Sequence, residues 1–252
     1  MVLSSDVEPF RFSHFSIQHH RSAMPVTTDS VLLGAWTLTG SNPPPDMLLE
    51  TVLDIGTGCG VLALMMAQRF PHARIDAIEI DGPSAEEARE NVQASPWQDR
   101  ISVIHADFKT FAFSRTYSLI VCNPPYFQQA LESPHERRNR ARHSNTSGLT
   151  YQQLVNGVSR ILRDDGTLAL ILPAATKAAF LKAAMQNRVP LYPSRITYVV
   201  TSKKAAAPSL VLMELIKKQT TPLIESLSVY DDSGVNYHPQ YKELVRGFYP
   251  WA

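Results

Sequence analysis

The feature that most constrains the fold is the stretch at residues 51–60, where a short apolar run leads into three closely spaced glycines. Its first half is predicted to form a buried strand, and the apolar-rich segment 61–70 is predicted to form a helix. Glycine suits the turn between them because the backbone must bend sharply and approach a ligand closely. A strand, a glycine turn and a helix start together predict a ligand site at one edge of a sheet.

The spacing of the glycines leaves two kinds of ligand to compare. The pattern is Asp54-x-Gly56-x-Gly58-x-Gly60, which differs from the G-x-G-x-x-G spacing of dinucleotide sites. Asp54 would repel a pyrophosphate, whereas it could pair with the cationic amino group of the methionine part of S-adenosylmethionine. In the third interpretation, the glycine-rich stretch binds no ligand and only forms the turn between strand and helix.

Composition excludes several classes of protein. The 252 residues suit one large α/β domain, and 44% hydrophobic with 19% charged residues is ordinary for a globular chain. No apolar run is long enough for a membrane span, and residues 1–6 do not resemble a secretory signal. Two cysteines, Cys59 and Cys122, provide neither a disulfide framework nor a metal cluster, so we expect a cytoplasmic protein without a metal. The net charge of +1 does not decide whether nucleic acid is a partner.

The order of predicted elements indicates an α/β fold. Before the glycine turn, residues 12–17 suit a short strand or hairpin arm, and residues 27–30 cap a helix that starts at 31. Further helices are predicted at 84–93, with a capping box from Ser84 and Glu87, and at 151–162 and 174–185. Strands are predicted at 74–80, 101–105, 117–122, 167–172, 191–201 and 210–216. We therefore expect a doubly wound, mostly parallel, seven-stranded sheet with an antiparallel C-terminal strand pair.

Acidic residues recur where these strands end. Glu79, with Asp81 as a close rival, could accept hydrogen bonds from both ribose hydroxyls of a nucleoside. Asp107 could accept from an adenine amine while Phe108 packs against the ring, although an aspartate here could also be only a turn residue or helix cap. Because the carboxyl ends of parallel strands meet at one edge, these side chains are expected to share a site.

The most specific signal is Asn123-Pro124-Pro125-Tyr126 at the end of a predicted strand. Two prolines stiffen the backbone, and the first holds Asn123 in an extended conformation. The Asn123 side-chain oxygen and the Pro124 carbonyl could then accept the two hydrogens of one planar NH2 group. Tyr126 offers a flat face for stacking a flipped base, with Phe127 beside it. The alternative is a proline-rich structural turn.

A basic interval follows this tetrapeptide. Residues 135–143, called the arginine interval below, suit phosphate contacts because they directly follow a base-sized pocket. A solvated loop with some ion pairs is the alternative. The residues predicted to contact RNA here are Arg137, Arg138, Arg140 and Arg142.

These motifs resemble the class I S-adenosylmethionine-dependent methyltransferases that act on amino groups. More narrowly, residues 10–12, 24–36, 141–143 and 248–250 resemble the bacterial tRNA(Val) adenine-N6 methyltransferases. That family modifies the adenine just 3′ of the anticodon, adenine 37. The chain departs from the family pattern at Pro25, Thr27 and Ser209.

The resemblance implies a role for each motif. Asp54, Gly56 and Gly58 would hold the methionine end of S-adenosylmethionine, Glu79 its ribose and Asp107 its adenine; Thr28 would also contact the cofactor. Asn123, Pro124 and Tyr126 would hold the target base. Residues 1–50 would form an extension that covers the cofactor and substrate site, and residues 51–252 the Rossmann-like catalytic domain. The partner would be tRNA, and the protein would be a monomer.

Three other functions fit part of the pattern. A protein-glutamine N5 methyltransferase of the release-factor type uses the same tetrapeptide, but usually carries an extra helical domain ahead of the core. A ribosomal RNA guanine-N2 methyltransferase usually has Phe in place of Tyr126. A non-catalytic RNA-binding module could keep the fold, but it would not need Asp54, Glu79 and Asn123 together.

Overall fold

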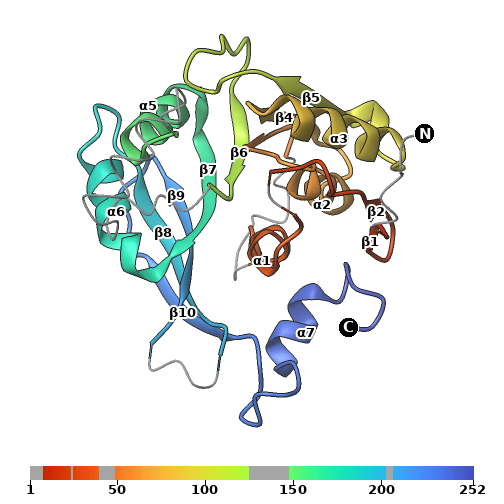
Figure 1. Cartoon of the computed structure of the whole chain (residues 1–252). Helices are drawn as coiled ribbons and strands as arrows, with labels where there is room; N and C mark the ends of the chain where they lie inside the picture. The colour runs from red at the N-terminus through yellow and green to blue at the C-terminus, as the bar shows by residue number, and fades with distance from the viewer. Residues whose placement is uncertain (1–7, 24, 40–48, 125–147, 203–206) are drawn as a thin grey trace, which may run out of the picture.

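The computed structural model describes residues 8–23, 25–39, 49–124, 148–202 and 207–252 (Figure 1). Its centre is an eight-stranded sheet with the strand order β10-β8-β9-β7-β6-β3-β4-β5. These strands are β3 (Thr51–Ile55), β4 (Arg74–Glu79), β5 (Ile101–His105), β6 (Tyr117–Cys122), β7 (Leu162–Pro173), β8 (Tyr192–Val200), β9 (Leu210–Ile216) and β10 (Leu223–Ser228). Strands β3 to β7 pair in parallel, and β9 runs antiparallel to both β7 and β8.

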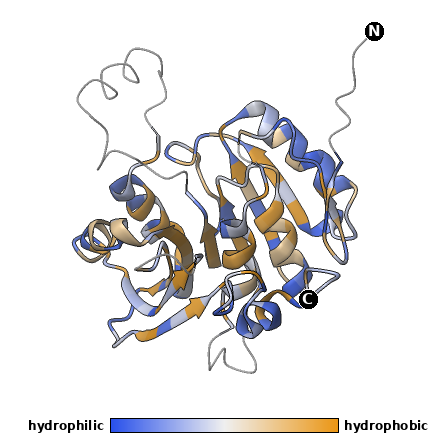
Figure 2. Cartoon of the chain, turned by 60° about the horizontal axis from the view of Figure 1, so that its bottom comes forward, coloured by the Kyte–Doolittle hydropathy of each residue, from blue (hydrophilic) through white to orange (hydrophobic). Residues whose placement is uncertain are grey.

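Helices cover both faces of the sheet, which explains why its central strands are buried and mainly apolar. All six residues of β6 are buried, as expected for a parallel strand with a helical layer on each side. One apolar core lies under α1 (Thr28–Trp36), α2 (Val61–Arg69) and α7 (Pro239–Val245). The other lies under α5 (Tyr151–Ile161) and α6 (Lys177–Met185). Figure 2 shows the central strands largely in the hydrophobic colour.

The strand order reverses direction between β3 and β6. From β3 the chain proceeds outward through β4 to β5, and it then returns to place β6 on the other side of β3. In open α/β sheets, ligands bind outside the carboxyl ends of the strands at such a switch point. Here the loop after β3 holds the glycine turn and the residue after β6 is Asn123. The topology therefore places the two most specific sequence motifs beside one another.

The predicted α/β class is confirmed, with differences in detail. The sheet has eight strands rather than seven, because Leu223–Ser228 adds β10 in parallel to β8 at the edge. Strand β7 begins at Leu162, before the predicted start at 167, and its early part is irregular, because the pairing jumps from Tyr117 with Leu162 to Leu119 with Thr167. Strand β10 was not predicted because an edge strand buries little apolar surface, so the alternation of apolar and polar residues along it is weak.

The capping box predicted from Ser84 and Glu87 is wrong. Helix α3 (Gly82–Gln93) starts two residues earlier, and its N-cap is Asp81, whose side chain accepts the Ser84 backbone N–H. Asp81 suits this position because its short carboxylate satisfies an amide that the first helical turn leaves free. The Glu87 side chain instead accepts backbone N–H groups of the N-terminal segment.

The N-terminal segment lies against the same layer as α2. Its hairpin consists of β1 (Phe10–Arg11) and β2 (Ser16–Ile17), so the strand predicted over 12–17 is mostly the hairpin turn. Helix α1 begins at Thr28, three residues before the predicted start, and its cap is the first residue of the predicted 27–30 segment, Thr27, which accepts the Ser30 backbone N–H. Among the helices of the described residues, none has the length and apolarity that crossing a membrane would require.

Candidate active site

The glycine turn is shaped by backbone conformations that other residues rarely adopt. Gly56, Gly58 and Gly60 have φ values of 70°, 55° and 90°, which lie in the left-handed region that glycine enters without steric cost. The backbone N–H of Gly56 donates to the Ile78 carbonyl at 2.9 Å, and that of Gly58 donates to the Glu79 carboxylate at 2.8 Å. The turn is thereby fixed to the end of β4.

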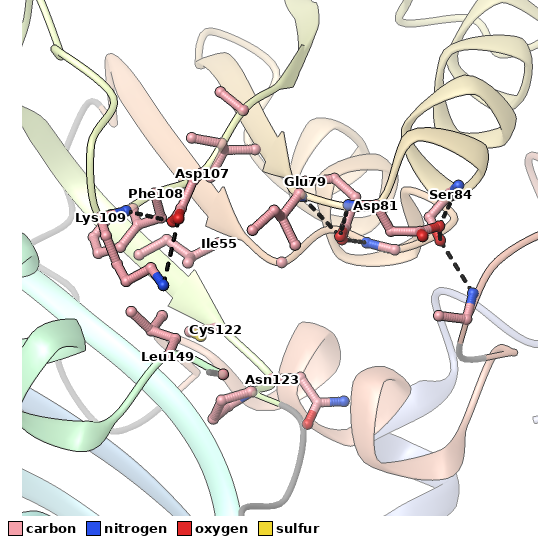
Figure 3. A pocket seen from close by; sticks show the side chains of 18 of the residues that line it. Ile55, Glu79, Asp81, Ser84, Asp107, Phe108, Lys109, Cys122, Asn123 and Leu149 are labelled. Carbon is pink, nitrogen blue, oxygen red and sulfur yellow. Dashed lines mark hydrogen bonds and ion pairs between the residues drawn. The ribbon is translucent and has the colours of Figure 1, made fainter. Parts of the chain in front are cut away.

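A cavity of about 330 Å³ opens at this edge of the sheet (Figure 3), a volume within the range of small-molecule sites. Most predicted cofactor and target residues line it together: Gly56, Gly58, Glu79, Asp107, Phe108, Asn123 and Pro124. The sequence reasoning missed other lining residues: Ser22, Ala23, Ile55, Ile78, Ile80, Ser84, Ala106, Lys109, Cys122, Gly148 and Leu149. The walls are therefore mainly apolar, with a few polar groups set among them.

Glu79 is held in place by three backbone amides. One carboxylate oxygen accepts the N–H groups of Ile80 and Asp81, both at 2.9 Å, and the other accepts that of Gly58. Each carboxylate oxygen has two lone pairs, so Glu79 keeps acceptor capacity for a ligand. Asp81 also lines the cavity, and its Oδ2 accepts both the backbone N–H and the hydroxyl of Ser84. The hydroxyl bond is the main reason that the pKa of Asp81 lies below its usual value.

Asp107, Phe108 and Lys109 lie at the left of the cavity in Figure 3, and Asp81 and Ser84 at the right. The Asp107 carboxylate accepts the Lys109 backbone N–H at 2.9 Å and lies 3.4 Å from the Lys109 ammonium. The Phe108 ring is buried against α5, whose approach depends on Gly157. A Cβ at position 157 would lie only 2.5 Å from the ring. Because position 157 has no side chain, the Phe108 ring can pack closely against α5, and a larger residue there would push the ring toward the cavity.

Asn123 follows directly on β6 and lies across the cavity from Glu79 (Figure 3), and Pro124 after it also lines the cavity. The Asn123 side-chain NH2 donates to the Ser30 hydroxyl on α1 at 2.9 Å. Helix α1 thus contacts the tetrapeptide directly, a contact that the sequence did not reveal. The other predicted target residues, Tyr126, Phe127, Arg137, Arg138, Arg140 and Arg142, lie outside the described residues.

Glu87 connects the N-terminal segment to the cavity. Its fully buried carboxylate accepts the backbone N–H groups of His20, Arg21 and Ser22 at 2.8–3.0 Å. Asn91, one helical turn later, bonds both the N–H and the carbonyl of Gln18. Helix α3 therefore holds residues 18–23, called the N-terminal strap below, along the rim where Ser22 reaches the cavity.

Two buried polar atoms near the glycine turn have no hydrogen-bond partner among the described residues: Oγ of Ser22, which lines the cavity, and Oδ1 of Asp54, a predicted cofactor residue that is not among the lining residues. Asp54 is fully buried, and its other oxygen accepts the Thr57 hydroxyl at 2.5 Å and the Ala63 N–H at 3.1 Å. Burial raises the pKa of Asp54 to about 7. A buried acceptor without a partner costs stability, so these atoms suit a polar ligand.

Thr28 is not brought together with the other predicted cofactor residues. It lines a separate hollow with Asp29, between α1 and the ends of β8 and β9. Within the described ranges, no group of three or more His, Cys, Asp or Glu side chains is arranged to hold a metal ion.

Comparison with known sequences identifies the family of this chain. A model of the methyltransferase small domain matches residues 42–201. A tRNA1(Val) (adenine(37)-N6)-methyltransferase from Bacteroides fragilis is 40% identical over 245 residues, covering 95% of this chain and 97% of the relative. A protein of the same name from Vibrio campbellii is 38% identical over 240 residues, covering 95% of each.

Solved structures agree on the fold. A predicted O-methyltransferase from Agrobacterium tumefaciens matches with a TM-score of 0.64 at 19% identity, covering 87% of this chain and 96% of that one. A putative RNA methyltransferase from Pyrococcus horikoshii matches with a TM-score of 0.53 at 17% identity, covering 80% and 88%. The chain therefore belongs to the tRNA1(Val) (adenine(37)-N6)-methyltransferase family and has the class I methyltransferase fold.

Proposed function

We propose that this protein transfers a methyl group from S-adenosylmethionine to N6 of adenine 37 in a valine tRNA. The observation that carries the proposal is that Asn123 shares one cavity with the glycine turn and with Glu79. Family membership supports the reaction, because relatives at about 40% identity across nearly their whole length are named for it.

The residues of the cavity fit S-adenosylmethionine. Its methionine end would lie at the glycine turn, where the unpartnered Ser22 hydroxyl and Asp54 Oδ1 suit its charged amino and carboxylate groups. Glu79, with Asp81 beside it, would accept from the ribose hydroxyls, and Asp107 from the adenine amine, with Phe108 against the ring. When bound, this cofactor supplies an electrophilic methyl on a sulfonium.

The tetrapeptide would hold the target amine. An adenine NH2 group is a weak nucleophile because its lone pair is delocalised into the ring. Asn123 Oδ1 and the Pro124 carbonyl would accept its two hydrogens, which aims the nitrogen lone pair at the methyl group. Both residues are on rigid backbone directly after a buried strand, so much of the rate enhancement would come from positioning. Tyr126 and Phe127 would stack the flipped base.

The rest of the chain would bind the RNA around this base. The arginine interval follows the tetrapeptide in sequence and would contact phosphates. Residues 1–50 would cover the site, which the contacts of the N-terminal strap and α1 support. Because mature tRNA is used in translation, we place the enzyme in the cytoplasm. We also propose that it acts as a monomer.

Labelled S-adenosylmethionine and unmodified tRNA test the proposal. The protein is incubated with total tRNA from a strain that lacks it, and the RNA is digested to nucleosides. We expect the label in N6-methyladenosine, and in RNA fragments that contain position 37 of valine tRNA. Label in N2-methylguanosine, or in a protein glutamine, would overturn the proposed substrate.

A further inference from the structure

We propose that Ser30 is a positioning residue that sets the direction of the catalytic Asn123 amide, an inference that rests on the proposed function. The Asn123 Nδ2 group donates to Ser30 Oγ at 2.9 Å. An amide nitrogen can only donate, so the serine oxygen is the acceptor in this bond. The nitrogen and oxygen of an amide lie on opposite sides, and holding the nitrogen therefore fixes where the oxygen points.

This direction matters because an asparagine side chain does not choose it by itself. The last torsion of asparagine is broad and nearly two-fold, so the exchanged positions of nitrogen and oxygen differ little in energy without a partner. Only the oxygen can accept a hydrogen from the target amine. A flipped Asn123 would present its NH2 to the NH2 of adenine, which is a repulsive pair of donors. Ser30 therefore favours the productive orientation when its own hydroxyl proton is directed away from Asn123, toward the Thr27 hydroxyl oxygen 3.4 Å away.

The surroundings of Ser30 prepare it for this role. It is buried in the first turn of α1, so water competes little for its hydroxyl. Its backbone N–H donates to the Thr27 hydroxyl, and the two hydroxyl oxygens are 3.4 Å apart. The Ser30 hydroxyl can accept from Asn123 while its own proton faces the Thr27 oxygen, because a hydroxyl both donates and accepts. The Asn123 bond is the shorter of the two, at 2.9 Å against 3.4 Å for the contact between the two hydroxyl oxygens.

The contact also connects two distant parts of the chain. Ser30 belongs to α1, whereas Asn123 follows β6, and 93 positions separate them. Helix α1 is further anchored by Trp36, whose ring nitrogen donates to the Thr197 hydroxyl at 3.0 Å on β8. The orientation of the catalytic amide thus depends on a helix that lies outside the glycine-turn and tetrapeptide motifs.

The test compares Ser30→Ala with Ser159→Ala. Both remove a buried helical hydroxyl, but Ser159 lies on α5 and bonds the Asn156 carbonyl. We expect Ser30→Ala to lower kcat about three- to tenfold, the range of one lost net hydrogen bond. Its affinity for S-adenosylmethionine, measured by calorimetry, should equal that of the wild type. Ser159→Ala should keep kcat within about twofold, and Ser30→Thr, which retains the hydroxyl, should recover most of the lost rate.

A second measurement does not depend on methyl transfer. The side-chain NH2 resonances of Asn123, identified by their disappearance in Asn123→Asp, should shift in Ser30→Ala and stay in place in Ser159→Ala. If Ser30→Ala does not fold, Ser30→Gly removes the same hydroxyl and carries the same expectations. An unchanged kcat, or an equal loss of cofactor binding, would overturn the role of Ser30. A wild-type protein that leaves tRNA adenine unmodified would instead refute the proposed function.

Discussion

Replacing Glu87 by Gln tests how the N-terminal strap is held at the cavity. The buried carboxylate accepts three backbone N–H groups, two on one oxygen and one on the other. Glutamine offers a single acceptor oxygen. In its better orientation it keeps the bonds to His20 and Arg21, and turns an NH2 donor toward the N–H of Ser22. At least one charge-assisted hydrogen bond is lost, which costs about 1.5–3 kcal/mol.

This loss predicts two measurable effects. For a chain of this size it lowers Tm by about 3–12 °C in calorimetry. Hydrogen exchange of the amides at 20–22 should accelerate about 10- to 150-fold, because local opening of the N-terminal strap becomes easier. The matched control is Glu86→Gln on the exposed side of the same helix, which should change neither result appreciably. A Glu87→Gln protein that melts within about 1 °C of the wild type, with unchanged exchange at 20–22, would refute the reasoning.

Three further predictions address the rest of the site. Gly157→Ala places a methyl group against the Phe108 ring and should weaken S-adenosylmethionine binding several-fold by calorimetry. Gly247→Ala, where an added Cβ has no neighbour closer than 4.0 Å, should not; equal effects would contradict this packing. Asp54 holds its proton to about pH 7 when folded but only to about pH 4 when unfolded. Relative to Asp54→Asn, the wild type should therefore lose stability as the pH rises from about 4 to 7, and a pH-independent difference in denaturant titrations would exclude this assignment. Replacing all four arginines of the arginine interval by alanine should weaken tRNA binding and flatten its salt dependence in filter-binding titrations; unchanged affinity would show that this interval does not contact phosphates.

The sequence predicted those parts of the site that depend on backbone geometry. Three glycines in alternate positions require a backbone that few other residues adopt, and Asn123 before two prolines requires a fixed extended one. Each motif follows a buried strand, so the rule for parallel sheets brought Gly56, Glu79, Asp107 and Asn123 to one edge without further information.

The parts that were missed depend on contacts between segments distant in sequence. Glu87 lies three residues after Ser84, which matches a capping box, but its carboxylate bonds amides more than 60 positions away. The bond between Ser30 and Asn123 is equally long-range. No local pattern contains these pairs, and neither propensity nor periodicity distinguishes a buried partner from a helix cap. Likewise, β10 is an edge strand whose pairing with β8 is decided by the assembled sheet.

The central claim is that Asn123 acts on the target amine and leaves the methyl donor to other residues. It is tested most directly by measuring, on the same preparation of Asn123→Ala, the affinity for S-adenosylmethionine by calorimetry and methyl transfer to valine tRNA in single turnovers. The account predicts that transfer falls below detection while the cofactor Kd stays within about threefold of the wild type. Transfer at the wild-type rate, or a parallel loss of cofactor binding, would contradict it.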